Sequence, residues 1–143
     1  MTQVASAVQK VRTVQIVLMI TIPLYGLAGE SLAPLVPKEL KIILPAILMF
    51  DLFIVVGGLI LRARMVRAAE EALRLHPDDA QALNRWRAGT LGLLVLTESV
   101  ALSGVALRIM GSSFWDVVPF YAGAILLMLL WTPRLDVSSS NQT

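Results

Sequence analysis

The stretch from Leu91 to Met110, LGLLVLTESVALSGVALRIM, is apolar enough to lie in lipid, but it carries a carboxylate, Glu98, near its middle. A charged side chain at the centre of a bilayer costs on the order of 3 kcal/mol unless it is neutral, paired or hydrated. The rest of the chain must therefore provide surroundings that tolerate Glu98. These residues predict an architecture and a candidate site, but they do not predict an activity.

Composition favours a membrane protein over an unusually apolar soluble bundle. Of the 143 residues, 57% are hydrophobic and 15% are charged, whereas soluble domains carry roughly 25% charged residues. The chain has no cysteine and a single histidine, His76, which argues against a disulfide framework, a thiolate metal site and a histidine-rich metal or haem site. We expect no cofactor and no metal. The net charge of +2 gives no indication of a nucleic-acid partner.

Four apolar segments predict an all-α membrane domain with four transmembrane helices, at about residues 12–28, 42–61, 88–109 and 114–131. Each is close to the 17–25 residues that a spanning helix needs. Residues 1–13 are expected to be a polar lead-in, and residues 29–41 a loop broken by Pro34 and Pro37. Residues 111–113, Gly-Ser-Ser, predict a tight turn.

Residues 62–87 predict a short cytoplasmic helical hairpin between spans two and three. His76 and Pro77 break its first helix, and Asp78 and Asp79 are expected in the first turn of its second helix. The spacing also predicts i,i+4 ion pairs, Arg67 with Glu71 and Glu70 with Arg74.

Basic residues predict the orientation, because they collect on the cytoplasmic side of membrane proteins. One side of the predicted topology holds Lys10, Arg12, Arg62, Arg64, Arg67, Arg74, Arg85, Arg87 and Arg134; the other holds Lys38, Lys41 and Arg108. We therefore expect both termini in the cytoplasm of a bacterial cell with the protein in its inner membrane. The six arginines from Arg62 to Arg87 are expected to contact the lipid surface, and Trp86, Trp115 and Trp131 to lie at the membrane interfaces.

The two halves of the chain resemble each other. Residues 17–48 align without gaps on residues 95–126, with eight identities: Val17/Val95, Leu18/Leu96, Leu24/Leu102, Gly26/Gly104, Ala28/Ala106, Ala46/Ala124, Ile47/Ile125 and Leu48/Leu126. The pattern favours a duplicated helical hairpin, related by an axis along the membrane normal. Glu98 aligns with Ile20, so only the second half carries this carboxylate.

A second acid, Asp51, lies at a depth similar to that of Glu98. Glu98 is roughly 15 Å along span three, and Asp51 is roughly 13–14 Å along span two from the opposite side, at 1.5 Å per residue. Both are thus near the midplane of a core about 30 Å thick, where the chain has no lysine or arginine. We expect at least one acid to be neutral at pH 7. The pair suggests a shared ion or proton site, completed by those of Thr97, Ser99, Ser103, Tyr25 and Tyr121 that lie on the same face.

Three roles for these acids remain open. They can lock the bundle, as a neutral Asp51–Glu98 pair or through separate hydrogen bonds. They can handle protons or cations. They can also meet a basic residue of a partner subunit.

Small residues predict close helix packing. Ser99 and Ser103 are four residues apart beside Gly104 on span three, and Gly57 and Gly58 are adjacent on span two. At the outer turn, Arg108 and Asp116 are expected to form a local, exposed ion pair.

The segment TESVALSGVALRI resembles the ion-carrying helix of the c-type proteolipids of rotary ATPases, in which a membrane-buried acid precedes a small-residue run. Glu98, Ala101, Leu102 and Gly104 stand in matching places, although here the acid is on the first helix of its hairpin and the family places it on the second. The resemblance implies a carboxylate that binds protons or cations. The overall layout is also similar to that of small four-span bacterial membrane proteins, which carries over no function.

The residues include no nucleophile–base pair, metal cluster or phosphate loop, so we do not expect an enzyme. The first hypothesis is a non-catalytic structural or accessory subunit of a larger membrane complex, with the lipid bilayer and other membrane subunits, or further copies of itself, as partners. The alternative is a proton- or cation-handling protein that uses Glu98 and Asp51.

Overall fold

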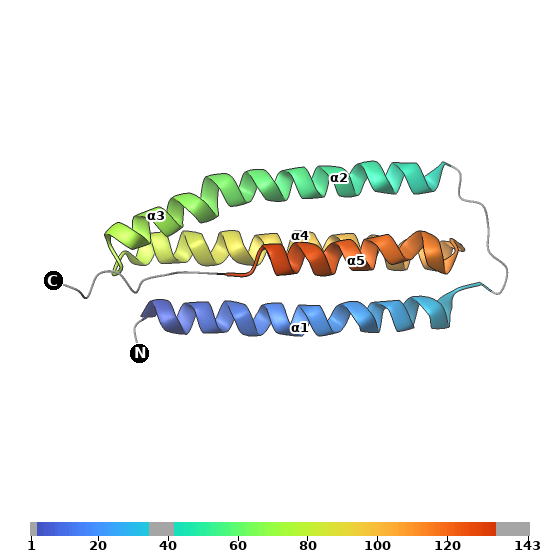
Figure 1. The fold of residues 1–143 in the computed structure, drawn as a ribbon, viewed down its shortest axis with the longest axis horizontal. Coiled ribbons are helices and arrows are strands. Elements are labelled where there is room, and N and C mark those ends of the chain that lie inside the picture. The colour runs from blue at the N-terminus through green and yellow to red at the C-terminus, as the bar shows by residue number, and fades with distance from the viewer. Residues whose placement is uncertain (1–2, 35–41, 134–143) are drawn as a thin grey trace.

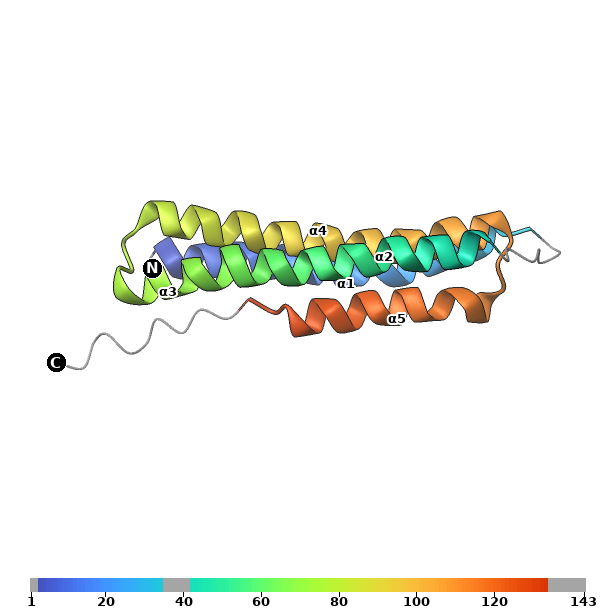
Figure 2. The ribbon, with the colours of Figure 1, turned by 90° about the horizontal axis from the view of Figure 1, so that it is seen from above.

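The computed structural model describes residues 3–34 and 42–133, and these residues form a bundle of helices without strands. The helices are α1 (Gln3–Leu32), α2 (Ile43–Leu61), α3 (Arg67–Leu75), α4 (Ala80–Met110) and α5 (Phe114–Leu130). All run close to one long axis (Figure 1). Seen from above, α4 and α5 lie on opposite sides of α1 and α2 (Figure 2). The all-α prediction is confirmed.

Three helical segments are long and apolar enough to cross a membrane: Gln3–Leu32, Ile43–Leu75 and Ala80–Met110. The second is continuous because one π-helical turn, Arg62–Val66, joins α2 to α3. Helix α5 is apolar but shorter, with 17 residues.

The first helix starts earlier than the sequence predicts. The expected polar lead-in is helical from Gln3 onward, and Val4, Ala7 and Val11 are buried on one of its faces. Their spacing of three and four residues is that of an amphipathic helix, so this segment packs on the bundle. The helix also runs on to Leu32, into the predicted loop, of which residues 35–41 lie outside the described part.

The turn between α3 and α4 differs in detail from the prediction. Helix α3 ends at His76, whose extended backbone suits a residue that precedes proline. Asp79 is the N-cap of α4, and its side chain accepts hydrogen bonds from the backbone N–H groups of Gln81 and Ala82. The acids therefore precede the first turn of α4. The predicted ion pairs within residues 67–74 are not formed: the one ion pair among the described residues lies elsewhere.

The turn between α4 and α5 is tight, as expected. Gly111 has φ 109°, a left-handed conformation that favours glycine, and closes the C-terminus of α4. Ser113 and Asp116 then form a reciprocal capping box at the start of α5. The predicted pair of Arg108 with Asp116 is thus wrong, because the Asp116 carboxylate bonds to Ser113 and Arg108 binds another residue.

Helix α4 is the centre of the bundle. It contacts α1, α2, α3 and α5, whereas α1 and α2 have no Cα atoms within 8 Å of each other. Figure 1 shows α4 and α5 between α1 and α2. A symmetric duplication would pair α1 with α2 as α4 pairs with α5, and the described helices lack that pairing.

Two of the three tryptophans are buried inside the bundle. Trp86 is fully buried and Trp131 is 3% exposed, whereas Trp115 is 78% exposed. Trp131 packs against Gly58, where the missing side chain leaves room for its ring. The position of a residue at the end of a span does not say which side of the helix it occupies.

Candidate functional site

Glu98 lies in the interface between α1 and α4. The phenol of Tyr25 on α1 donates a hydrogen bond to Glu98 Oε1 over 2.5 Å. The second carboxylate oxygen, Oε2, is buried and has no partner among the described residues. The tyrosine therefore supports one half of a carboxyl group that the apolar helix surface could not accommodate alone.

Asp51 lies in a different interface, between α2 and α4. The Ser103 hydroxyl on α4 donates to Asp51 Oδ1 over 2.8 Å, while Oδ2 is buried without a partner in the described chain. Asp51 is 6% exposed, and α2 buries only this residue and Gly58. The apolar contacts of α2 with the core come from half-buried residues: Ile43, Leu44, Ile47, Ile54 and Leu61.

The two acids do not form a single hydrogen-bonded pair. Glu98 and Ser103, the partner of Asp51, are five residues apart on α4, which places them roughly 140° apart around a helix with 3.6 residues per turn. Each acid thus has its own hydroxyl donor in its own interface. Among the roles that the sequence left open, separate hydrogen bonds for the two acids agree with the contacts of the described residues.

The other predicted polar contributors bond elsewhere. The hydroxyls of Thr97 and Ser99 donate to carbonyls four residues earlier on their own helix, Leu93 and Val95. Tyr121 OH is buried and has no partner in the described part of the chain. The predicted set of hydroxyls around one acid pair is thus not assembled.

A groove of about 240 Å³ opens beside Asp51 between α2 and α5. Leu48, Leu52 and Val55 of α2 line one wall, Pro119 and Phe120 of α5 line the other, and Val100 of α4 lies between them. Helices α2 and α5 have no Cα atoms within 8 Å of each other. Asp51 is thus the one polar side chain in the lining of an otherwise apolar groove.

The predicted packing glycines behave differently from one another. A Cβ on Gly58 would lie 2.6 Å from Trp131 Cη2, and one on Gly104 would lie 3.1 Å from Phe120 Cβ. Both positions therefore permit close approach of neighbouring helices. Gly57 does not: a Cβ there would meet nothing within 4 Å, and the residue is exposed.

Ser99 and Ser103, predicted with Gly104 as a packing strip, are both half-buried. The Ser103 hydroxyl donates to Asp51 and lies near the Ser99 carbonyl, 3.1 Å away. This serine thus links α4 to α2 through a hydrogen bond rather than through close packing alone.

The seam between α1 and α4 has a second polar contact, at the outer end. Arg108 binds both carboxylate oxygens of Glu30, with its Nε 2.6 Å and its Nη2 2.8 Å away, and its Nη1 donates to the Ser112 carbonyl. The hydrogen bond from Arg108 lowers the pKa of Glu30, which lies beyond the predicted span 12–28. The sequence held a signal for this pair, because Glu30 and Arg108 are equivalent in the 78-residue repeat and spans one and three run the same way.

A third contact connects α1 to the end of α5. Gln15 is 4% exposed, and its Nε2 donates to the Met128 carbonyl over 2.6 Å. The sequence did not predict this contact of Gln15, because a single glutamine near the start of a span has no pattern that distinguishes it from an exposed residue. Helix α1 thus has polar contacts to α4 through Tyr25 and Glu30, and to α5 through Gln15.

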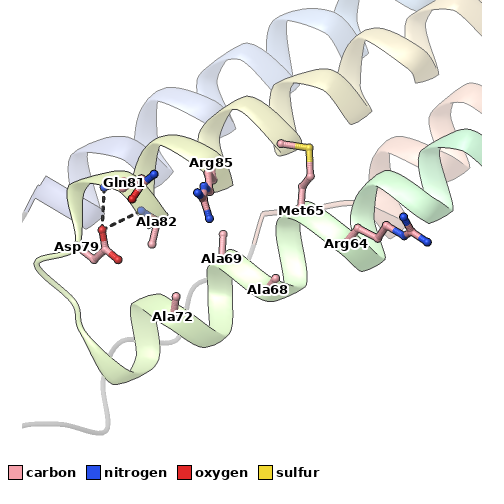
Figure 3. A pocket seen from close by; sticks show the side chains of 9 residues that line it. All are labelled: Arg64, Met65, Ala68, Ala69, Ala72, Asp79, Gln81, Ala82 and Arg85. Atoms are coloured by element: carbon pink, nitrogen blue, oxygen red, sulfur yellow. Dashed lines mark hydrogen bonds between the residues drawn. The ribbon is translucent and has the colours of Figure 1, made fainter.

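The basic end of the bundle contains a pocket of about 330 Å³ between α3 and the start of α4. Figure 3 shows Arg85 extending from α4 toward the alanines of the facing helix, while Asp79 is engaged in capping. Arg64 also lines the pocket. Among the six predicted lipid-surface arginines, Arg64, Arg67, Arg74 and Arg85 are exposed, Arg62 and Arg87 are half-buried, and Arg62 donates to the Leu130 carbonyl over 3.0 Å.

None of these six arginines pairs with a carboxylate in the described segments. The same segments hold no group of three or more histidine, cysteine, aspartate or glutamate residues that could bind a metal ion. The two buried acids and the arginines of residues 62–87 are therefore among the polar side chains without a charged partner in the described chain.

Comparison with known proteins gives no relative: no family model matches the chain, and neither a curated protein nor a solved structure matches it.

Proposed function

We propose that this protein is a non-catalytic structural or accessory subunit of a larger membrane complex. It spans the bacterial inner membrane four times, with α5 as the fourth and shortest span. Both termini and the 62–87 hairpin lie in the cytoplasm. The complex, and not this chain, carries the catalytic activity.

One observation carries the proposal: α2 is attached to the bundle by one neighbour among the other spans, α4, and buries only Asp51 and Gly58 there. Its other faces expose large apolar residues, among them Phe50, Phe53 and Leu59. Lipid can cover such faces, but lipid cannot satisfy the buried Asp51 oxygen that has no partner. A neighbouring subunit can cover the face and supply that partner.

The test is purification of the full chain from its native membranes in a mild detergent, followed by native mass spectrometry. We expect a complex with other membrane proteins in a constant ratio. Recovery of the chain only as a monomer or as a homo-oligomer would contradict the proposal.

The orientation can be tested separately by cysteine labelling in intact cells. Cysteines at Glu39 and Ser112 should react with an impermeant thiol reagent, and cysteines at Gln81 and Ser139 should not. The six arginines from Arg62 to Arg87 would then lie beside anionic lipid, at about 1 kcal/mol per near-surface basic residue. Labelling at Gln81 in intact cells would reverse the proposed orientation.

The alternative function is proton or cation handling by Glu98 and Asp51. It is supported by the buried oxygens that each acid leaves without a partner in the described chain, since a carboxyl that exchanges a proton or ion needs a free site. Glu98→Gln removes the exchanging group and keeps nearly the same shape.

Transport measured in proteoliposomes separates the two functions. If the protein is a carrier, Glu98→Gln should lose transport but still assemble. If Glu98 has only a structural role, the Glu98→Gln variant should assemble and function much as the parent does. Hydrophobic carbodiimides add a second measurement, because they modify protonated carboxyls in apolar surroundings. An unmodified Glu98 together with a fully active Glu98→Gln protein would exclude the carrier function.

A further inference from the structure

The geometry points to the groove between α2 and α5 as the docking site for a transmembrane helix of a different protein, one that brings a lysine or arginine to Asp51. This inference rests on the proposed function, since it identifies the surface and chemistry by which the subunit joins its complex. The groove is the surface defined above by Leu48, Leu52, Val55, Pro119 and Phe120.

The first step of the argument concerns the vacant position on Asp51. The side chain is 94% buried, being 6% exposed, and its Oδ2 has no partner in the described residues. Ser103 supplies a single neutral donor, to Oδ1. A carboxylate in so apolar a place is stabilised most by a cationic donor, which gives shorter and stronger hydrogen bonds than a hydroxyl.

The second step concerns where that donor can come from. The basic residues in the described part of the chain lie toward helix ends, and the outermost of them, Arg108, is occupied by Glu30. None of the four apolar spans carries a lysine or arginine near its middle. A second copy of this chain therefore cannot bring a cation to Asp51 at mid-depth, and the donor must belong to a different chain.

The third step concerns shape. The stretch from Leu48 to Val55 is about 10 Å long at 1.5 Å per residue, which is two turns of a helix. About one turn beyond Val55 along α2, Gly58 packs against Trp131. The rest of the lining is apolar, as a surface that contacts another transmembrane helix must be. The partner therefore presents its basic residue about halfway along its span.

The experiment is site-specific photocrosslinking of the full chain in native membranes. A photoreactive phenylalanine analogue replaces Leu52 in the groove, and a matched control replaces Leu24, an equally exposed residue of α1. We expect Leu52 to yield one discrete product, whose crosslinked peptide maps to a transmembrane segment with a central lysine or arginine. The control position should not yield that product.

Variants then test the role of the charge. Asp51→Asn should reduce the Leu52 product at least tenfold, and Glu98→Gln, which alters the other buried acid, should leave it unchanged. Leu52→Trp, which fills the groove and keeps Asp51, should remove the partner from the purified complex. Exchange of the two charges, Asp51→Lys with the partner's basic residue changed to aspartate, should restore association.

The outcomes that overturn the inference are distinct. A crosslink to a second copy, to lipid alone or to a segment without a basic residue excludes this docking site. So does a product that Asp51→Asn leaves unchanged in a variant that elutes as a folded, monodisperse protein. If the native complex remains intact while Leu52 gives no partner product, the docking site is wrong and the accessory-subunit function stands; if the chain purifies alone, both fail.

Discussion

The two buried acids lie at similar depths in very different interfaces. Glu98 is in the seam between α1 and α4, which is also held by the Glu30–Arg108 pair at its outer end, while Gln15 ties α1 to the end of α5. Asp51 is at the edge of a groove, on a helix that packs along α4 and has no Cα atom within 8 Å of α5, although Gly58 meets Trp131 just past the end of α5. Each acid leaves one carboxylate oxygen without a partner among the described residues; the difference is that α1 and α4 pack directly on each other around Glu98, whereas an open groove lies beside Asp51.

In this bundle, the contacts that hold the helices together and the surface proposed to bind a partner lie in different places. The polar contacts of the seam join α1 to α4 and α5 without help from another protein. Helix α2 instead depends on the anchor at one end, where Gly58 meets Trp131 and Arg62 binds the Leu130 carbonyl. Its middle is free to meet a partner. Three comparisons test this division, and their expected effects on stability decrease in turn.

The largest effect is expected at the anchor of α2. In Gly58→Ala the new Cβ would lie 2.6 Å from Trp131 Cη2, and this ring is 3% exposed and so has little room to move. Overpacking of this kind costs about 1–3 kcal/mol. Detergent-induced unfolding in mixed micelles, followed by tryptophan fluorescence, measures the loss.

The matched control is the neighbouring Gly57, where a Cβ meets nothing within 4 Å. Gly57→Ala should leave the free energy of unfolding unchanged or raise it by about 0.5–1 kcal/mol, because alanine loses less backbone entropy than glycine in a helix. Equal losses in the two variants would show that α2 is not anchored at Gly58.

A smaller effect is expected in the seam. Tyr25→Phe removes the donor to Glu98 Oε1 and leaves the helices in place. Interhelical hydrogen bonds in membranes contribute about 0.6 kcal/mol on average and at most about 1.7 kcal/mol, so the same unfolding measurement should show a loss in this range. The helical content seen by circular dichroism should not change.

Tyr121 provides the control for this hydroxyl. Its OH is buried without a partner among the described residues, so Tyr121→Phe should cost nothing or increase the stability, because it removes an unsatisfied polar group. A larger loss in Tyr121→Phe than in Tyr25→Phe would contradict the polar contacts assigned to the seam.

The smallest effect concerns pH at the outer end of the seam. Arg108 lowers the pKa of Glu30 below its ordinary value of 4.5. A carboxyl with a lowered pKa in the folded state stabilises the fold above the unfolded-state value, and this contribution is lost as the pH falls through the folded-state pKa. The thermal midpoint of the parent should thus exceed that of Glu30→Gln at pH 7.

That difference should shrink as the pH is lowered below about 4.5 and disappear once Glu30 is protonated. High salt should reduce it as well, because the Glu30 side chain is 42% exposed. A difference that stays constant between pH 7 and pH 3 would mean that the pair does not contribute through its charge.

The apolar runs were enough to predict the all-α class and the bounds of α2 and α5 within a residue, whereas α1 and α4 begin nine and eight residues before the predicted spans. The partners of polar residues were harder to predict, because they depend on rotation about each helix axis. The sequence predicted a similar depth for Asp51 and Glu98, but it could not predict that the two acids face different neighbours. Arg108 was assigned to Asp116, the acid nearest in sequence, although Asp116 caps its own helix and Glu30 lies across the seam.

The hydrogen-bond partner of Glu98 shows why only part of the candidate site could be predicted. The hydroxyl of the next residue, Ser99, looked as suitable a partner for Glu98 as that of Tyr25, which is 73 residues away in sequence and adjacent in space. Helical serines and threonines bond readily to their own backbone, and Thr97 and Ser99 do so. Composition alone cannot distinguish such local bonds from contacts between helices.

The π-helical turn Arg62–Val66 sets the angular phase between two stretches of one long helix. Counting from Gly58 in steps of about 3.6 residues leads to positions near 62, 65, 69 and 72. The buried residues of the second stretch are Val66, Ala69 and Leu73, so two of the three lie up to one residue later than the count. The wider turn supplies the missing fraction of a residue. The π-helical turn therefore sets the direction in which α3 faces relative to Asp51, and an insertion or deletion within residues 62–66 would rotate α3 relative to the part of α2 that carries this acid.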